Sequence, residues 1–114
     1  MLNGTDQRHG DEITFGQFRL SLAERLLERS GSRVQLTARA LDVLVALIER
    51  AGEVVSKKEL MARVWSDVTV DEGSLRFHIV ALRKALGEGQ AGARYITTVS
   101  GKGYCFVSPV SRSS

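Results

Sequence analysis

The chain has 114 residues and a mass of 12.5 kDa, with 43% apolar and 25% charged side chains. This length accommodates one hydrophobic core and argues against a multidomain assembly. No apolar run reaches the roughly 18–20 residues of a membrane span, so we expect no membrane contact within this chain and a cytoplasmic location. One cysteine and two histidines form no cluster with metal-ligand spacing, so we expect neither a metal nor another cofactor.

Charge is distributed unevenly along the chain, although the net charge is only +3. Residues 56–114 hold nine Lys and Arg against five Asp and Glu, whereas residues 1–36 hold five of each kind. This basic excess in the C-terminal half favours an anionic partner for that half.

The N-terminal third has the pattern of short strands. After a leader over residues 1–12 that we expect to be disordered, Ile13, Phe15, Phe18 and Leu20 recur at mostly even spacing, which is typical of half-buried strands. The turn-forming residues 30–32 separate two further arms, 26–29 and 33–36, and predict a hairpin. We therefore expect about four short strands.

The middle of the chain changes to helical spacing. A first helix is expected from the N-cap Thr37 to Gly52, and a second from Ser56, which begins the capping box Ser-Lys-Lys-Glu. Residues 53–55 between them are a loop or one short strand. A third helix is expected over 71–86, capped by Asp71, with Leu75, Ile79, Leu82 and Leu86 facing inward.

The C-terminal third predicts a hairpin. A glycine-rich loop over 87–92 precedes two β-rich arms, 95–99 and 104–107, around the tip 100–103. Gly101 and Gly103 are expected to supply positive φ angles for a tight turn. Residues 109–114 are interpreted as a linker or frayed end.

This order of elements indicates an α+β winged helix-turn-helix, a fold in which the longer helix can enter the major groove of DNA. The runs VVSKKELMARVW (54–65), HI (78–79), LRKAL (82–86) and YITTVSGKGYCF (95–106) resemble the OmpR/PhoB-type DNA-binding effector domain of bacterial transcription regulators. The resemblance covers residues 13–108, the expected domain, and implies an N-terminal four-stranded antiparallel sheet, three helices and a C-terminal β-hairpin wing. It also implies two-component-like regulation of transcription through sequence-specific binding of double-stranded DNA.

Candidate DNA contacts follow from a helical wheel of residues 71–86, on which the face opposite the leucines is the one that this fold presents to the groove. Arg76 and Arg83 are candidates for base or phosphate contact, and Lys84 for phosphate contact. The other candidates on this helix are Gly73, Phe77, Val80 and His78, the last being a packed or phosphate-facing imidazole. A solvated helix surface would also explain the charged residues.

Outside this helix, Lys57 and Lys58 lie in the first turn of the second helix, where free amides favour a phosphate. In the wing, residues 99–104, the candidates are Thr98 at its base, Ser100 and Lys102. The family often has an arginine in place of Ser100, so the resemblance does not extend to minor-groove reading by this residue, and Lys102, the remaining cation of the wing, is a candidate for contact with the DNA backbone. The resemblance further implies RNA polymerase as a partner of residues 65–70, as in some members, and a homodimer on DNA.

An alternative function is a winged-helix module for protein association that uses Phe77, Val80 and Ala81. Enzyme activity is not expected, because the G-x-G-x-x-G match at 87–92 follows a helix and Cys105 has no adjacent base. The operator, an activating or repressing role and the oligomeric state stay open. So does the signal input, since the chain is either a fragment or the start of a protein whose sensor lies beyond Ser114.

Overall fold

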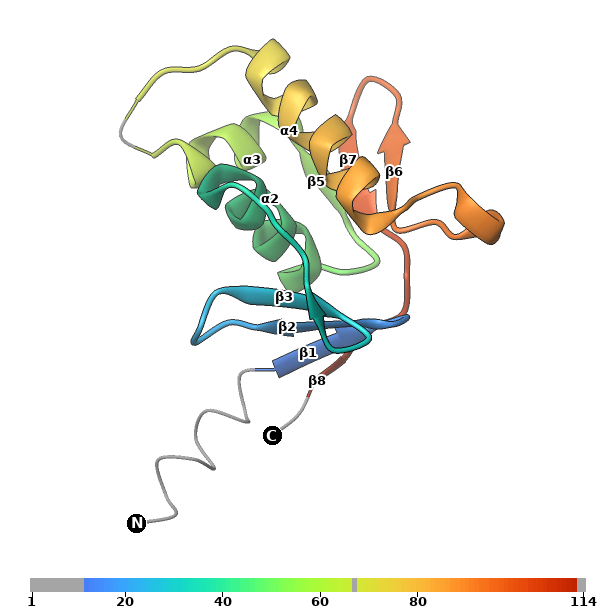
Figure 1. Cartoon of the computed structure of the whole chain (residues 1–114). Coiled ribbons are helices and arrows are strands. Elements are labelled where there is room, and N and C mark those ends of the chain that lie inside the picture. Colours follow the sequence, from blue (N-terminus) through green and yellow to red (C-terminus); the bar gives the residue numbers. More distant parts are fainter. Residues whose placement is uncertain (1–11, 67, 113–114) are drawn as a thin grey trace. The chain divides into compact units, whose positions relative to one another are not determined.

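The computed structural model describes residues 12–66 and 68–112, so residues 1–11 of the leader expected over 1–12 lie outside them, whereas its last residue, Glu12, begins the first strand. The chain divides into two compact units (Figure 1). One contains the described residues up to Gln35 together with those from Pro109 onward, and the other contains residues 36–108. The single domain expected over 13–108 stays a prediction, whereas the C-terminal segment expected to be a linker contributes a strand to the N-terminal sheet.

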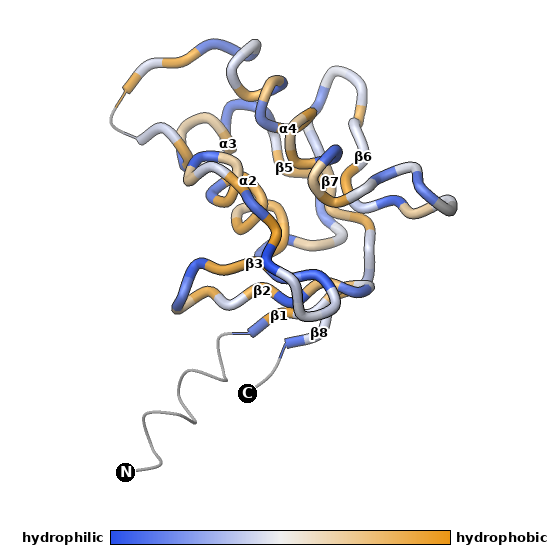
Figure 2. The backbone as a smooth tube through the Cα atoms, in the orientation of Figure 1, coloured by the Kyte–Doolittle hydropathy of each residue, from blue (hydrophilic) through white to orange (hydrophobic). Residues whose placement is uncertain are grey.

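The first unit is an antiparallel sheet with the strand order β4-β3-β2-β1-β8. Its strands are β1 (Glu12–Phe15), β2 (Phe18–Ser21), β3 (Leu26–Arg29), β4 (Ser32–Arg33) and β8 (Ser111–Arg112). Hydrophobic and hydrophilic residues alternate along β1 and β2 (Figure 2), so that Ile13, Phe15 and Leu20 are buried while Thr14 and Arg19 are exposed.

The predicted hairpin at residues 30–32 is confirmed. Ser30 and Gly31 connect β3 to β4 with φ angles of 49° and 86°, which are the two positive values that a two-residue type I′ turn requires. β4 is shorter than the arm expected over 33–36 and contains only Ser32 and Arg33.

The four-stranded prediction for this sheet missed one strand. Ser111 pairs with Thr14 and Arg112 pairs with Ile13, so the segment interpreted as a linker or frayed end contributes β8 to the free edge of β1. Two residues are too few to show the alternation by which a strand is recognised in a sequence.

The second unit contains the helices α2 (Ala38–Glu49), α3 (Lys57–Val64) and α4 (Glu72–Leu86), the 3₁₀ turn η1 (Gln90–Gly92), and a sheet of the order β5-β7-β6. Its strands are β5 (Val54–Ser56), β6 (Ile96–Val99) and β7 (Gly103–Phe106). α2 contacts α3, α4 and β7. The core of this unit is dominated by fully buried large side chains: Leu44, Leu47, Leu60, Leu75, Ile79, Leu82, Leu86 and Phe106.

The predicted helix starts are confirmed by their caps. The side chains of Thr37, Ser56 and Asp71 accept hydrogen bonds from the backbone N–H groups of Ala40, Glu59 and Ser74, respectively. Glu59 also completes the capping box expected from the sequence. The end of α2 differs, because its C-cap is Arg50 rather than Gly52.

Across the described ranges, no helix combines the length and hydropathy that crossing a bilayer requires.

Candidate nucleic-acid interface

The outward face of α4 carries a continuous stripe of exposed residues. Helical spacing places Leu75, Ile79, Leu82 and Leu86 in the core, where each is 0–1% exposed. The opposite side exposes Gly73, Arg76, Phe77, Val80 and Lys84, which we call the α4 stripe. The sequence-based assignment of the two faces is therefore confirmed. The stripe combines two cations with two apolar side chains, and it contains no acidic residue.

The hairpin formed by β6 and β7 lies beside α4 in the same unit (Figure 1). Its tip is closed by a hydrogen bond from the backbone N–H of Lys102 to the carbonyl of Val99, at 2.9 Å. Ser100, Gly101 and Lys102 are exposed at this tip, and Gly101 has the expected positive φ, 74°. The wing thus presents one cation on a short, tightly turned support.

Gly103 serves a different purpose from the one expected, since its φ is not positive. A Cβ atom at this position would lie 2.0 Å from the carbonyl oxygen of Val55 and 2.9 Å from the Cα of Ser56. Gly103 therefore allows β7 to approach β5 closely. β5 pairs with β7 and extends the wing into a three-stranded sheet. The sequence had left residues 53–55 as either a loop or one short strand, and the structure shows a strand over residues 54–56.

Arg83 does not extend from the α4 stripe, although the wheel places it near Arg76. Its guanidinium donates to the carbonyl of Ile96, at 3.1 Å from Nη2, and to the hydroxyl of Thr98, at 2.8 Å. Its Nε also lies 3.6 Å from a carboxylate oxygen of Glu88. Both Arg83 and Thr98, predicted as DNA contacts, are thus engaged with each other between α4 and β6.

Glu88 is a site residue that the sequence analysis missed. Its Oε1 accepts hydrogen bonds from the backbone N–H groups of Tyr95 and Ile96, at 3.3 and 3.0 Å, while its other oxygen faces Arg83. Glu88 therefore fixes the start of β6 to the end of α4. Sequence pattern offered no signal for this, because the residues from 87 to 92 have the composition of any glycine-rich loop.

The first turn of α3 carries the two predicted lysines in different environments. Lys58 is exposed, whereas Lys57 forms an ion pair with Glu72 at 3.4 Å. This ion pair connects the N-terminal turns of α3 and α4. Lys58 remains an exposed cation beside the amides of a helix start, the environment that was expected to favour a phosphate.

His78 lies in a chain of aromatic contacts rather than alone at the surface. Its ring meets Trp65 and Phe77 edge-on, with centroid separations of 5.4 Å in both cases. Its Nδ1 is 2.8 Å from the carbonyl oxygen of Ser74, so Nδ1 carries the proton that is donated to this acceptor. The guanidinium of Arg39 lies over the Trp65 ring, 5.7 Å from its centroid, and donates to the carbonyl of Val64, a contact that the sequence did not indicate.

Ion pairs fasten α3 to the end of α2. Arg50 contacts Glu53 at 3.2 Å and Glu59 at 2.7 Å, and Arg63 pairs with Glu49. Hydrogen bonds from Arg50 and from the backbone of Ser56 lower the pKa of Glu59 below its ordinary value. The same carboxylates, Glu53 first and then Glu59, raise the pKa of Arg50. These groups hold the helix pair together.

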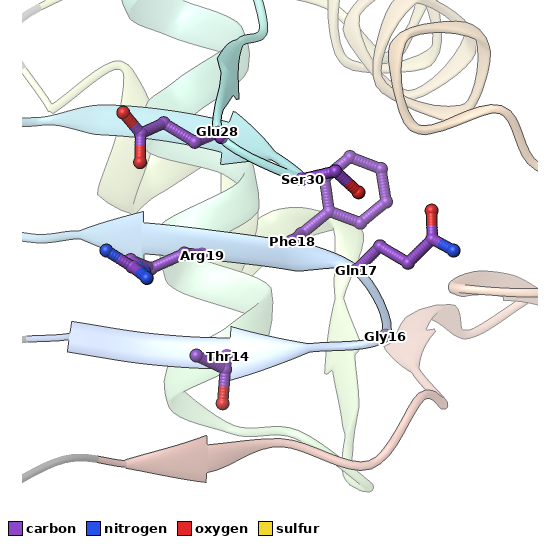
Figure 3. A pocket seen from close by; sticks show the side chains of 8 residues that line it. Thr14, Gly16, Gln17, Phe18, Arg19, Glu28 and Ser30 are labelled. Carbon is purple, nitrogen blue, oxygen red and sulfur yellow. The ribbon is translucent and has the colours of Figure 1, made fainter.

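Neither of two pockets found among the described residues is lined by residues of the α4 stripe or the wing. One, of about 210 Å³, lies on the N-terminal sheet and is lined by residues such as Thr14, Arg19 and Glu28 from three neighbouring strands (Figure 3). A second lies between α2, β5 and α3, beside the Arg50–Glu59 pair. Within residues 12–66 and 68–112, no three His, Cys, Asp or Glu side chains form a group suited to a metal.

A helix pair, a third helix with an exposed cationic face, and an adjoining β-hairpin define a winged helix-turn-helix. The chain belongs to the family described as "Transcriptional regulatory protein, C terminal", whose model matches residues 31–106. The OmpR/PhoB-type resemblance and the α+β winged-helix class expected from the sequence are thereby confirmed.

Individual relatives agree with this assignment. The transcriptional regulator HilA of Salmonella typhimurium is 43% identical over 99 residues, which are 87% of this chain but 18% of that protein. The chain thus spans less than a fifth of the length of this relative. The DNA-binding domain of E. coli CadC superposes with a TM-score of 0.81 at 29% identity, over 90% of this chain and 96% of that domain. The Klebsiella pneumoniae RstA DNA-binding domain, solved in complex with the RstA box, gives a TM-score of 0.72 at 30% identity, over 84% and 96% of the two chains.

Proposed function

We propose that this chain is the sequence-specific, double-stranded DNA-binding part of a transcription regulator. In this proposal α4 enters the major groove, and the wing, residues 99–104, lies on the adjacent backbone or minor groove. The observation that carries the proposal is the α4 stripe, on which Arg76 and Lys84 are exposed on a helix whose other side is fully buried. A helix supported in this way can insert its exposed side into a groove about 12 Å wide without losing core contacts.

The side chains divide into those that read bases and those that position the protein. Arg76, near the N-terminal end of α4, is the candidate for base contact, because the N-terminal residues of a recognition helix are those that reach base edges. Lys84, Lys58 and Lys102 are candidates for phosphate contact, being exposed cations at the end of α4, the start of α3 and the wing tip. Ser100 adds a hydroxyl at that tip, and Gly73 lets the start of α4 approach DNA closely.

The test compares Arg76→Ala with the matched variant Lys58→Ala on two kinds of duplex. One is a duplex selected by the chain from a randomised pool, and the other is an unselected random duplex. We expect Arg76→Ala to cost about 1–3 kcal/mol on the selected duplex and to relax its sequence preference. Lys58→Ala should weaken binding to both duplexes by the same factor. Failure of the unaltered chain to bind either duplex at low salt would exclude the function.

Two protein partners are proposed with this function. We propose that residues 65–70 contact RNA polymerase, which is supported by the 52% exposure of Val68 in the connection between α3 and α4. We also propose that two copies bind DNA together as a homodimer. Pull-down of RNA polymerase by the chain and by Val68→Asp tests the first proposal, and the stoichiometry on a selected duplex tests the second.

The alternative, a protein-association module, is favoured by the exposure of Phe77 and Val80, at 69% and 57%. Ala81 is half-buried, so the apolar part of this face is narrower than the sequence predicted. It is also flanked by Arg76 and Lys84. A basic frame around two apolar side chains fits a polyanion better than an ordinary protein interface, which is depleted of lysine.

A further inference from the structure

Phe77 and Val80 lie outside the hydrophobic core. They are the most exposed of the large apolar residues in the described chain, at 69% and 57%, and they lie one helical turn apart on the α4 stripe. Neither contributes to the core, which is completed by the leucines and Ile79 on the other side of α4. Their side chains therefore remain available to whatever the stripe contacts.

The ring of Phe77 is held in place although it is exposed. It meets the imidazole of His78 at an interplanar angle of 83°, and His78 in turn meets Trp65 at 69°. His78 is fixed by its hydrogen bond to the carbonyl of Ser74, and Trp65 is only 7% exposed. Because this chain of contacts begins in the core, the ring is oriented before any partner arrives, which lowers the entropic cost of binding.

The charges around these side chains select the kind of partner. Arg76 and Lys84 flank them on the same stripe. A second copy of the chain seated on this face by twofold symmetry would bring these cations against their own counterparts, which is unfavourable. Duplex DNA presents phosphates to the cations and base edges to the apolar side chains between them. In the major groove the apolar feature of a base pair is the 5-methyl group of thymine.

We propose that Phe77 and Val80 recognise thymine through its 5-methyl group. This inference rests on the DNA-binding function proposed above and adds the identity of the base. Arg76 supplies hydrogen bonds and charge on the same face, whereas Phe77 and Val80 supply a contact that cytosine, which lacks the methyl group, does not satisfy.

The experiment replaces single thymines by deoxyuridine, which differs only by this methyl group. Duplexes are first selected from a randomised pool with the 114-residue chain. Each thymine of the best-bound duplex is then exchanged in turn, and dissociation constants are measured. We expect a loss of about fourfold at each contacted thymine, from the burial of one methyl group. Phe77→Ala and Val80→Ala should each bind the thymine and deoxyuridine forms of one such duplex equally well.

Val54→Ala is the matched control, because Val54 is an exposed apolar residue of β5, outside α4. It should retain the full preference for thymine. Arg76→Ala should weaken both forms of the duplex by the same factor. Circular dichroism of each variant verifies that the helices are intact.

Three results would overturn the inference. The first is a selected duplex without thymine in the half-site that faces α4. The second is equal binding of thymine and deoxyuridine by the unaltered chain, which leaves the DNA-binding function standing if binding is still sequence-specific. The third is a Phe77→Ala variant that keeps the thymine preference but changes from dimer to monomer in sedimentation, which assigns the residue to association. Absence of any duplex binding would instead refute the proposed function.

Discussion

At the scale of single residues, Gly103 shows how a backbone contact limits side-chain choice. A Cβ atom at this position would lie only 2.0 Å from the carbonyl oxygen of Val55. This oxygen is part of the backbone of β5, so it cannot move aside as a flexible side chain could. Gly101, two residues earlier, has open space around it but a φ of 74°. The two glycines of the wing are thus needed for different physical reasons.

We predict that Gly103→Ala lowers the free energy of unfolding by about 3 kcal/mol, because β5 and β7 must separate to admit the methyl group. Gly101→Ala should cost about 1–2 kcal/mol, the penalty of a left-handed conformation without a clash. Urea denaturation followed by the fluorescence of Trp65, the single tryptophan, measures both values. Equal losses for the two variants would contradict the steric explanation.

Glu59 takes part both in the capping box of α3 and in the ion pair with Arg50. The variant Glu59→Gln tests the two contributions separately, because Gln can still form the capping hydrogen bond but carries no charge. The folded-state pKa of Glu59 is lowered, so its charge stabilises the fold above the unfolded-state pKa, and this contribution is lost as pH falls through the folded value. We predict a lower Tm for the variant at pH 7, with the difference closing as the pH falls from the unfolded-state pKa through the lower folded-state pKa. A difference that persists below this range would exclude the carboxylate charge as its cause.

At the scale of elements, Arg83 connects α4 to the wing. Its contacts with Ile96, Thr98 and Glu88 hold β6 against the C-terminal half of α4. The guanidinium is 29% exposed and already has acceptors on β6 and at Glu88, so we interpret Arg83 as a positioning residue.

We predict a coupling of about 1 kcal/mol between Arg83→Gln and Thr98→Val in a double-mutant cycle of unfolding. Arg83→Gln should also weaken DNA binding while leaving the slope of log K against log salt unchanged, because no phosphate contact is removed. A slope reduced in magnitude by about 0.9 would instead assign Arg83 to a phosphate. Lys84→Gln, which alters the next residue on an exposed face, is the matched control and should reduce the slope by that amount.

At the scale of the whole molecule, the net charge is only +3, but the Lys and Arg side chains fall into two groups. Some are paired with carboxylates, and others are exposed. Lys57 and Arg83 are paired with Glu72 and Glu88, Arg50 is paired with Glu59 of α3, and Arg63 is paired with Glu49 of α2. The exposed candidates for DNA contact are Arg76, Lys84, Lys102 and Lys58.

We predict a slope of log K against log salt of about −4 for duplex DNA, from about −0.9 for each of these exposed cations. Fluorescence anisotropy of a labelled duplex between about 50 and 200 mM salt provides the measurement. A flat response would show that the basic residues do not contact phosphates, and a slope of about −5.4, from six such cations, would show that Lys57 and Arg83 exchange their protein partners for DNA.

Local patterns in the sequence were sufficient for the helices, their N-caps and the buried face of α4. Each of these depends on residues within a few positions of one another: Thr37, Ser56 and Asp71 satisfy amides three residues on, and the leucines of α4 repeat with the helical period. The order of these elements then indicated a winged helix-turn-helix, and the family resemblance implied that the helix carrying Arg76 is the one that contacts DNA.

Tertiary structure alone decided what depends on residues far apart in the chain. Three contacts join segments that are far apart in the sequence. They are the pairing of Ser111 with Thr14, the contact of Gly103 with Val55, and the hydrogen bond of Arg83 with Thr98. No local sequence pattern indicates any of these contacts. The sequence shows where a Lys or Arg stands in the chain, but only its neighbours in space determine whether its charge is available to bind an anionic partner. For this reason the sequence determined which side of α4 faces outward, and the fold determined that Arg76 is exposed while Arg83 is bound.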